Sequence, residues 1–100
     1  FIYKETSLFP IEERYGLTNQ IRRAAISIVA NIAEGSSRIS RKDQAYFTQI
    51  AYSSLIEVLS HFYIAYDLNY LSEEVLDEIK YKVNDISNLL NALRNYQTKQ

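Results

Sequence analysis

One stretch of the chain limits the possible folds more than any other. Residues 17 to 35 read as a helix that is apolar around most of its circumference and carries one narrow polar stripe. At about 100° per residue, the apolar arc contains Leu17, Ile21, Ala24, Ala25, Ile28, Val29, Ile32 and Ala33. The polar stripe contains Gln20, Arg23, Ser27, Asn31 and Glu34. Because so wide an apolar arc must be covered on more than one side, the sequence predicts an all-α fold built by helix packing.

Two further helices follow. Ser40 opens a capping box with Asp43, and the helix that begins there extends to residue 69. Two adjacent apolar stripes cover more than half of its circumference: Phe47, Ala51, Leu55, Val58, Phe62 and Ala65, and Tyr52, Ile56, Leu59, Tyr63, Tyr66 and Tyr70. The last helix, over 72–96, has a single apolar stripe and one polar face. Gly35, with Ser36 and Ser37, provides the break between the helix over 17–35 and the helix that begins at Ser40.

The connections predict one bundle rather than several domains. Residues 1–16 read as the end of a preceding helix and a connection that Pro10 interrupts. Short loops favour antiparallel up-and-down neighbours, so we expect a single helical-bundle domain over residues 1–100. The chain begins at Phe1 and contains no methionine, so we expect residues upstream of it. Two helices with two apolar faces each need cover from a preceding helix, a second subunit, or both.

Composition excludes several classes of site. The chain has no cysteine, which excludes disulfides, thiolate metal sites and a cysteine nucleophile. No segment has the roughly 20 apolar residues of a membrane-spanning helix, so we expect a protein of the cytoplasm that does not enter a membrane. The formal net charge is −1. However, residues 14–42 hold six basic residues and one acidic residue, which predicts a molecule with one basic end.

A resemblance to a known family is concentrated in two segments, 20–25 (Gln-Ile-Arg-Arg-Ala-Ala) and 27–35 (Ser-Ile-Val-Ala-Asn-Ile-Ala-Glu-Gly). It continues through Ser36-Ser37-Arg38 and over 50–57. There the chain resembles the bacterial four-helix bundle proteins first described as encoded in intervening sequences of 23S ribosomal RNA genes. The resemblance implies an antiparallel four-helix bundle, its first helix mostly truncated in this numbering. It also implies assembly into a homo-oligomeric ring, typically a homopentamer, without established enzymatic activity. The chain has Ser53 where the family usually has glycine.

The same family is related in fold to the accessory protein of diversity-generating retroelements. That protein is a basic ring that binds nucleic acid and a reverse transcriptase. By this similarity, RNA or DNA is an expected partner of the present chain. Repetition of a basic surface around a ring would strengthen its attraction to phosphates.

The polar stripe has two interpretations. Gln20, Arg23, Ser27, Asn31 and Glu34 together offer donors, acceptors and both charges, as a ligand-binding row would. The interpretation that we favour is a hydrogen-bonded seam between helices or subunits, because an unpaired buried polar group costs about 1 to 3 kcal/mol. Arg22 lies inside the apolar arc and therefore needs a partner or an exit to solvent.

The turn after the first full helix carries three bases, Arg38, Arg41 and Lys42. They are our candidates for sequence-independent contacts to nucleic-acid phosphates. In a single subunit we favour the interpretation of an ordinary solvated loop, because three bases are a weak electrostatic footprint. Repetition around a ring would change that balance.

Catalytic arrangements are missing from the sequence. His61, the one histidine, follows Glu57 by four residues, whereas di-iron bundles use a Glu-x-x-His pair twice. Gly16 and Gly35 cannot make a glycine-rich phosphate loop. The nine tyrosines mostly have the spacing of core residues rather than of a base-stacking platform.

The sequence thus predicts a non-catalytic scaffold that needs no cofactor and no metal. We expect it to bind itself and to associate with RNA or DNA. The first alternative is a protein–protein adaptor ring that binds an unidentified protein and no nucleic acid. A remote alternative is an enzyme that uses the polar stripe as its pocket.

Overall fold

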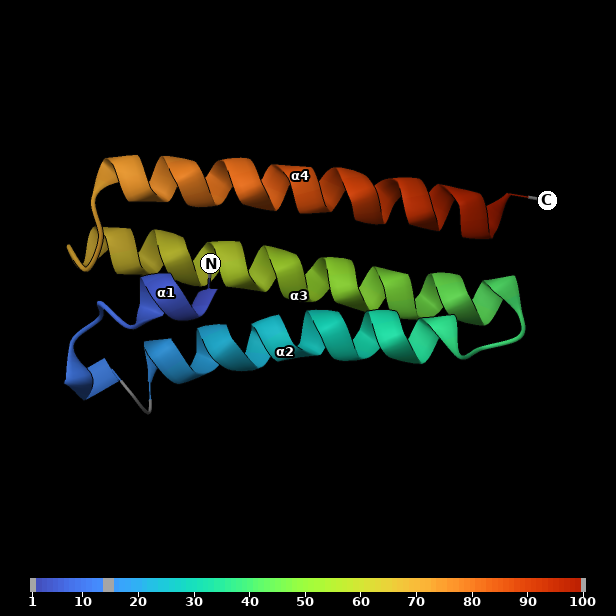
Figure 1. Ribbon diagram of the computed structural model, residues 1–100, viewed down its shortest axis with the longest axis horizontal. Helices are drawn as coiled ribbons and strands as arrows, with labels where there is room; N and C mark the ends of the chain where they lie inside the picture. Colours follow the sequence, from blue (N-terminus) through green and yellow to red (C-terminus); the bar gives the residue numbers. More distant parts are fainter. Residues whose placement is uncertain (1, 14–15, 100) are drawn as a thin grey trace.

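The computed structural model describes residues 2–13 and 16–99, all of whose regular elements are helical (Figure 1). A short helix α1 (Ile2–Thr6) and a 3₁₀ turn η1 (Ile11–Glu13) precede three long helices. These are α2 (Leu17–Ser36), α3 (Arg41–Asp67) and α4 (Glu73–Thr98). The all-α prediction is confirmed.

The three long helices run antiparallel, side by side, with α3 in the middle (Figure 1). Helix α3 packs against α2 on one side and against α4 on the other, while α2 and α4 do not pack against each other. Helix α1 packs against α2. The molecule is therefore elongated and thin, with Cα extents of 46, 25 and 17 Å. Such an open layer covers the central helix far better than its two flanking helices.

The core follows the central helix. Phe62, Leu55 and Val58 of α3 are completely or almost completely buried, as are Ile21 of α2 and Ile79 of α4. The remaining buried apolar residues are Phe9, Leu17, Ala24, Ala51, Ala65, Leu76, Val83 and Leu90. These side chains come from every long helix, so one continuous core holds the layer together.

Helix ends are set by side chains close by. Ser40 accepts a hydrogen bond from the amide of Asp43 at 3.0 Å, and this caps the start of α3. The start of α2 has no such cap on its own residue; instead the Glu13 carboxylate accepts from the Leu17 amide at 3.2 Å. The end of α3 differs from the sequence expectation of residue 69, because the left-handed Asn69 (φ 64°) turns the chain after Asp67.

Gly35 does not break α2 as expected. It lies inside the helix, which continues to Ser36, and it is buried against α3. A Cβ atom at this position would lie 3.1 Å from the Cβ of Phe47 and 3.3 Å from the carbonyl oxygen of Gln44. The glycine therefore permits a close approach of two helix backbones.

Among the described residues, no helix has the length and apolar character needed to cross a membrane.

Candidate functional site

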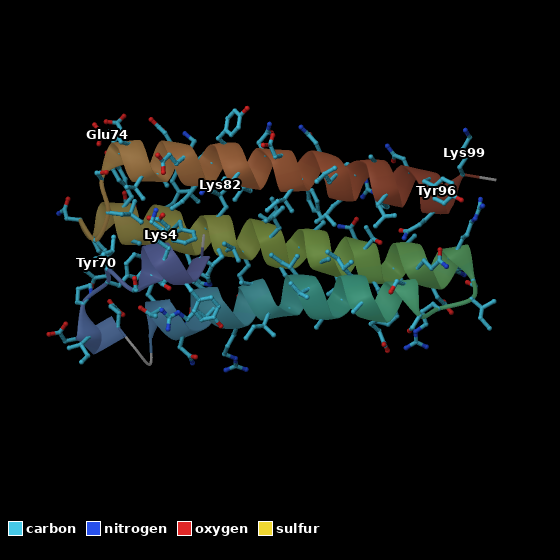
Figure 2. The ribbon with its side chains drawn as sticks, viewed as in Figure 1. Lys4, Tyr70, Glu74, Lys82, Tyr96 and Lys99 are labelled. Carbon is cyan, nitrogen blue, oxygen red and sulfur yellow. The ribbon has the colours of Figure 1, made fainter. Side chains whose placement is uncertain are left out.

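The basic turn predicted from the sequence lies at one end of the layer, where α2 ends and α3 begins. Arg41 reaches from α3 to the last turn of α4: its guanidinium carbon lies 4.8 Å from the centroid of the Tyr96 ring. It also donates to the Tyr96 hydroxyl and to the carbonyl oxygen of Lys99, each at 3.3 Å. Tyr96 and Lys99 both lie at the C-terminal end of α4 (Figure 2). Arg41 is thus held in place rather than free in solvent.

A cavity of about 550 Å³ opens beside this arginine. Its lining consists of Arg41, Lys42, Ala45, Gln97, Thr98 and Lys99. No lining side chain is a carboxylate. The N-terminal end of α3 and the C-terminal end of α4 meet at this cavity, so their helix dipoles oppose each other and the three cations supply the positive charge. The cavity is suited to an anionic group.

Arg38 does not share this cavity. Its guanidinium forms an ion pair of 2.6 Å with Glu34, one turn earlier, and lies 4.9 Å from the centroid of the Phe47 ring. The charge of Arg38 is therefore partly neutralised by its own helix end. The third basic residue of the cavity is Lys99 instead of Arg38. The sequence analysis missed Lys99 because it lies 58 residues from Arg41 and no local spacing connects the two.

The predicted polar seam divides into two parts. Ser27 of α2 shares a hydrogen bond of 2.9 Å with Ser54 of α3, and the Asn31 amide donates to the Ser27 hydroxyl at 3.1 Å. These residues link α2 to α3 within the subunit. Gln20, Arg23 and Glu34 are exposed, so a role for them between subunits stays a prediction.

Gln20, Arg23 and Ser27 also line a surface cavity of about 330 Å³, together with Ala24 and Glu57. Glu57 is 3.5 Å from the Nε2 atom of His61, an ion-pair distance only if the imidazole is protonated. Both ring nitrogens of His61 are buried and have no hydrogen-bond partner among the described residues. The described part of the chain contains no group of three or more residues suited to hold a metal ion.

Arg22 finds its partner inside the subunit. Its Nε atom donates to the Thr6 hydroxyl at 2.9 Å, and its guanidinium lies 4.6 Å from the centroid of the Tyr3 ring. The arginine within the apolar arc therefore anchors α1 to α2.

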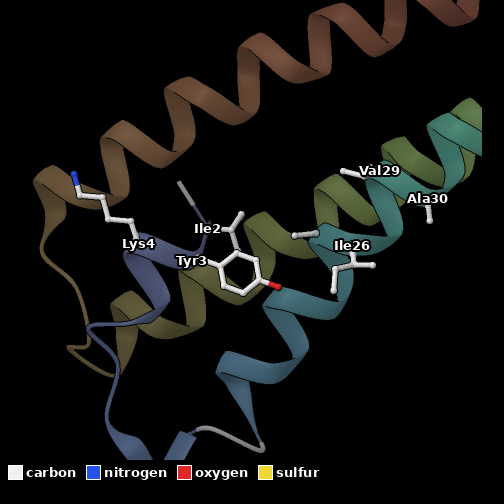
Figure 3. Close-up of a pocket in the computed structure, with 7 residues that line it drawn as sticks. Ile2, Tyr3, Lys4, Ile26, Val29 and Ala30 are labelled. Carbon is white, nitrogen blue, oxygen red and sulfur yellow. The ribbon is translucent and has the colours of Figure 1, made fainter.

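An apolar hollow lies between the same two helices (Figure 3). Its volume is about 560 Å³, and its lining consists of Ile2, Tyr3, Lys4, Ala25, Ile26, Val29 and Ala30. Val29 is 68% exposed and Ile26 is 57% exposed. With Tyr3 and Ile32 they form a surface that we call the α2 apolar surface. Single exposed apolar residues are ordinary on a protein surface, whereas a contiguous group is a candidate interaction site.

The opposite end of the molecule holds a carboxylate of altered acidity. Tyr70 donates from its hydroxyl to the Glu13 carboxylate at 2.7 Å, and the Leu17 amide donates to the same group. These two hydrogen bonds, that of Tyr70 first, lower the pKa of Glu13 from its ordinary value. The same bond to Glu13 raises the pKa of Tyr70. This pair joins η1 to the end of α3 and is structural.

Comparison with known proteins supports the family predicted from residues 20–25 and 27–35. A family model described as 23S rRNA-intervening sequence protein matches residues 1–92. No curated protein matches the chain. The match includes the polar stripe, Arg41 and Lys42, and it ends within α4, before Tyr96 and Lys99.

Proposed function

The chain belongs to the 23S rRNA-intervening sequence protein family, and we propose that it is a non-catalytic helical subunit of a homopentameric ring that associates with RNA or DNA through its basic end. The family description names no catalytic activity. The observation that carries the proposal is the cavity at the α3 start, where Arg41, Lys42 and Lys99 converge without a carboxylate in the lining. Phosphate groups are the anions that a nucleic acid offers to such a site.

The α2 apolar surface supports the assembly part of the proposal. Ile26 and Val29 are mostly exposed in the isolated subunit, although they belong to the apolar arc of α2. Burial of such side chains contributes about 25 cal/mol for each Å² removed from water. A second copy of the chain is the occupant that a ring requires, because closed symmetry presents the same surface on every subunit.

Ring formation would also strengthen the basic end. One subunit places three cations around the cavity, and a pentamer would repeat them five times. Each neutralised phosphate releases condensed counterions, so binding should weaken steeply as salt rises. Contacts of this kind carry no base sequence information.

The test combines absolute mass by light scattering with nucleic-acid binding at about 50 to 200 mM salt. A double variant, Lys42→Ala with Lys99→Ala, should weaken binding and flatten its salt dependence while the mass stays unchanged. Lys80→Ala with Lys82→Ala is the matched control, since it removes the same charge from exposed positions of α4 that line neither this cavity nor the hollow between α1 and α2. Equal binding by both double variants would contradict the assignment of the basic end.

The alternative is an adaptor ring that binds a protein and no nucleic acid. The α2 apolar surface is the observation that favours it, because a partner protein can bury the same residues. A ring of the expected mass that binds no RNA or DNA at about 50 mM salt would favour this alternative.

A further inference from the structure

We infer that the basic end binds single-stranded nucleic acid in preference to a duplex, with an unpaired base stacked on the ring of Tyr96. This inference rests on the proposed function and names the class of nucleic acid. It comes from one pairing at the cavity, that of a fixed cation with an exposed aromatic ring.

Tyr96 combines exposure with a place beside the basic cavity. It is 60% exposed, in the same range as Tyr46 (62%) and Tyr81 (71%), but among these three it is the one with a guanidinium over its ring. The Arg41 guanidinium lies over one face of the ring and also donates to its hydroxyl. Arg41 therefore helps to orient the ring, and the 60% exposure of Tyr96 leaves part of its surface accessible to a planar ligand.

Arg41 connects this ring to the phosphate cavity. The same guanidinium that covers Tyr96 lines the cavity with Lys42 and Lys99. A phosphate in the cavity would therefore contact this guanidinium, and a base on the other face of Tyr96 would be separated from it only by the ring. A nucleotide has this combination of an anion and a flat π-surface, whereas inorganic phosphate offers only the anion.

The aromatic ring discriminates single strands from duplexes. In a duplex, each base is stacked between its neighbours, so no base face is free for a protein ring. Lysine and arginine side chains alone would bind either form through phosphates. Only an unpaired base gains from Tyr96, and stacking of one base on an aromatic side chain changes affinity by about tenfold.

Tyr81 offers a matched control on the same helix. It is 71% exposed, and no cation lies over its ring among the described residues. Tyr81→Leu and Tyr96→Leu therefore remove the same groups from equally accessible positions of α4. Tyr96→Phe keeps the ring and removes only the hydroxyl that accepts from Arg41.

The experiment measures fluorescence anisotropy of a labelled oligouridine of about 12 nucleotides and of an RNA duplex of equal length, with the full chain. We expect the single strand to bind more tightly, and Tyr96→Leu to weaken that binding about tenfold while duplex binding is unchanged. Tyr81→Leu should bind as the unmodified chain does, and Tyr96→Phe should retain more strand binding than Tyr96→Leu, because it keeps the ring and loses only the hydroxyl that accepts from Arg41. Thermal unfolding followed by circular dichroism checks that each variant is folded.

Three results would overturn the inference. Equal affinity for strand and duplex, with no effect of Tyr96→Leu, would leave the proposed phosphate contacts in place without stacking. A proportional loss of strand and duplex binding in Tyr96→Leu would mean that the ring only positions Arg41. Binding of neither probe would overturn the proposed nucleic-acid association as well, which the Lys42→Ala, Lys99→Ala variant tests separately.

Discussion

His61 has buried polar atoms that make no hydrogen bond inside the isolated subunit. Neither ring nitrogen has a hydrogen-bond partner among the described residues, and the Glu57 carboxylate lies 3.5 Å from Nε2. When an apolar group of similar size replaces a buried polar group that has no hydrogen-bond partner, the free energy of unfolding stays the same or rises. The histidine thus costs stability unless another molecule satisfies it.

We expect His61→Leu to raise the free energy of unfolding by about 1 kcal/mol. Urea unfolding of both proteins in the same buffer measures this difference. A loss of more than about 1 kcal/mol would show that the nitrogens do have a partner in solution. Repetition at a protein concentration too low for assembly would then separate a partner in a neighbouring subunit from one within the chain.

Gly35 is a second position where one atom decides the packing. A methyl group there meets the Phe47 Cβ and the Gln44 carbonyl, and neither can rotate away because both belong to or adjoin the α3 backbone. Alanine is favoured over glycine in a helix interior by about 1 kcal/mol, but overpacking costs about 1 to 3 kcal/mol. We expect Gly35→Ala to destabilise the chain by about 1 kcal/mol in a urea titration. Ser36→Ala, at the adjacent exposed position, should change stability little.

At the scale of helices, the contact of Glu13 with Leu17 and Tyr70 makes the start of α2 sensitive to pH. The folded-state pKa of Glu13 is lowered, so its stabilising contribution is present above the ordinary pKa of 4.5 and is lost as pH falls through the folded-state value. Tyr70 behaves in the opposite sense. Its pKa is raised, so the same bond contributes below pH 10 and is lost as pH rises through the folded-state value.

We expect Glu13→Gln to lower the urea midpoint at about pH 7, and this deficit to shrink as pH falls toward about 3, through the lowered folded-state pKa of the wild-type carboxyl. Tyr70→Phe should show the same dependence on acid, because it removes the other partner of the bond. A midpoint difference that is independent of pH between these values would contradict the assignment of the cap to the ionised carboxylate. Glu12→Gln, one residue earlier and exposed, is the control.

The periodicity of apolar residues predicted the all-α class. Two helix ends could not be predicted from this periodicity, because they depend on the local backbone and on the partner helix. The spacing of apolar residues carries the α3 helix to residue 69, whereas Asn69 in the left-handed region ends it at Asp67. Gly35 has the sequence position of a helix stop, yet it serves the approach of α2 to α3. A glycine that ends a helix and one that lets two helices meet look alike in a single sequence, because the second role depends on the partner helix.

At the scale of the whole molecule, the candidate site was predicted only in part. Arg41 and Lys42 follow from the charge of the turn. Tyr96 and Lys99 join them because the antiparallel path of α4 returns its last turn to the start of α3. No local pattern contains that information. Arg22 is similar: its need for a partner follows from its place in the apolar arc, but the identity of Thr6 comes from the fold.

The open layer explains why α2 carries more apolar surface than its subunit covers. Helices α2 and α4 flank α3 without packing on each other, so among the described elements α2 meets, besides α3, only the short α1 and η1. Val29 and Ile26 are left mostly exposed at the hollow between these helices. If a neighbouring subunit covers them, a charge placed there should affect assembly far more than folding.

We expect Val29→Glu to convert the assembled protein to smaller species, because a buried unpaired carboxylate is strongly unfavourable at an interface. The isolated subunit should keep its helix content, since the side chain at this position is 68% exposed. Light scattering measures the mass, and circular dichroism measures the helix content. Leu89→Glu is the matched control, with a 70% exposed apolar residue on α4. Dissociation by Leu89→Glu but not by Val29→Glu would move the interface to α4, and an unchanged mass in both variants would contradict an apolar interface on either helix.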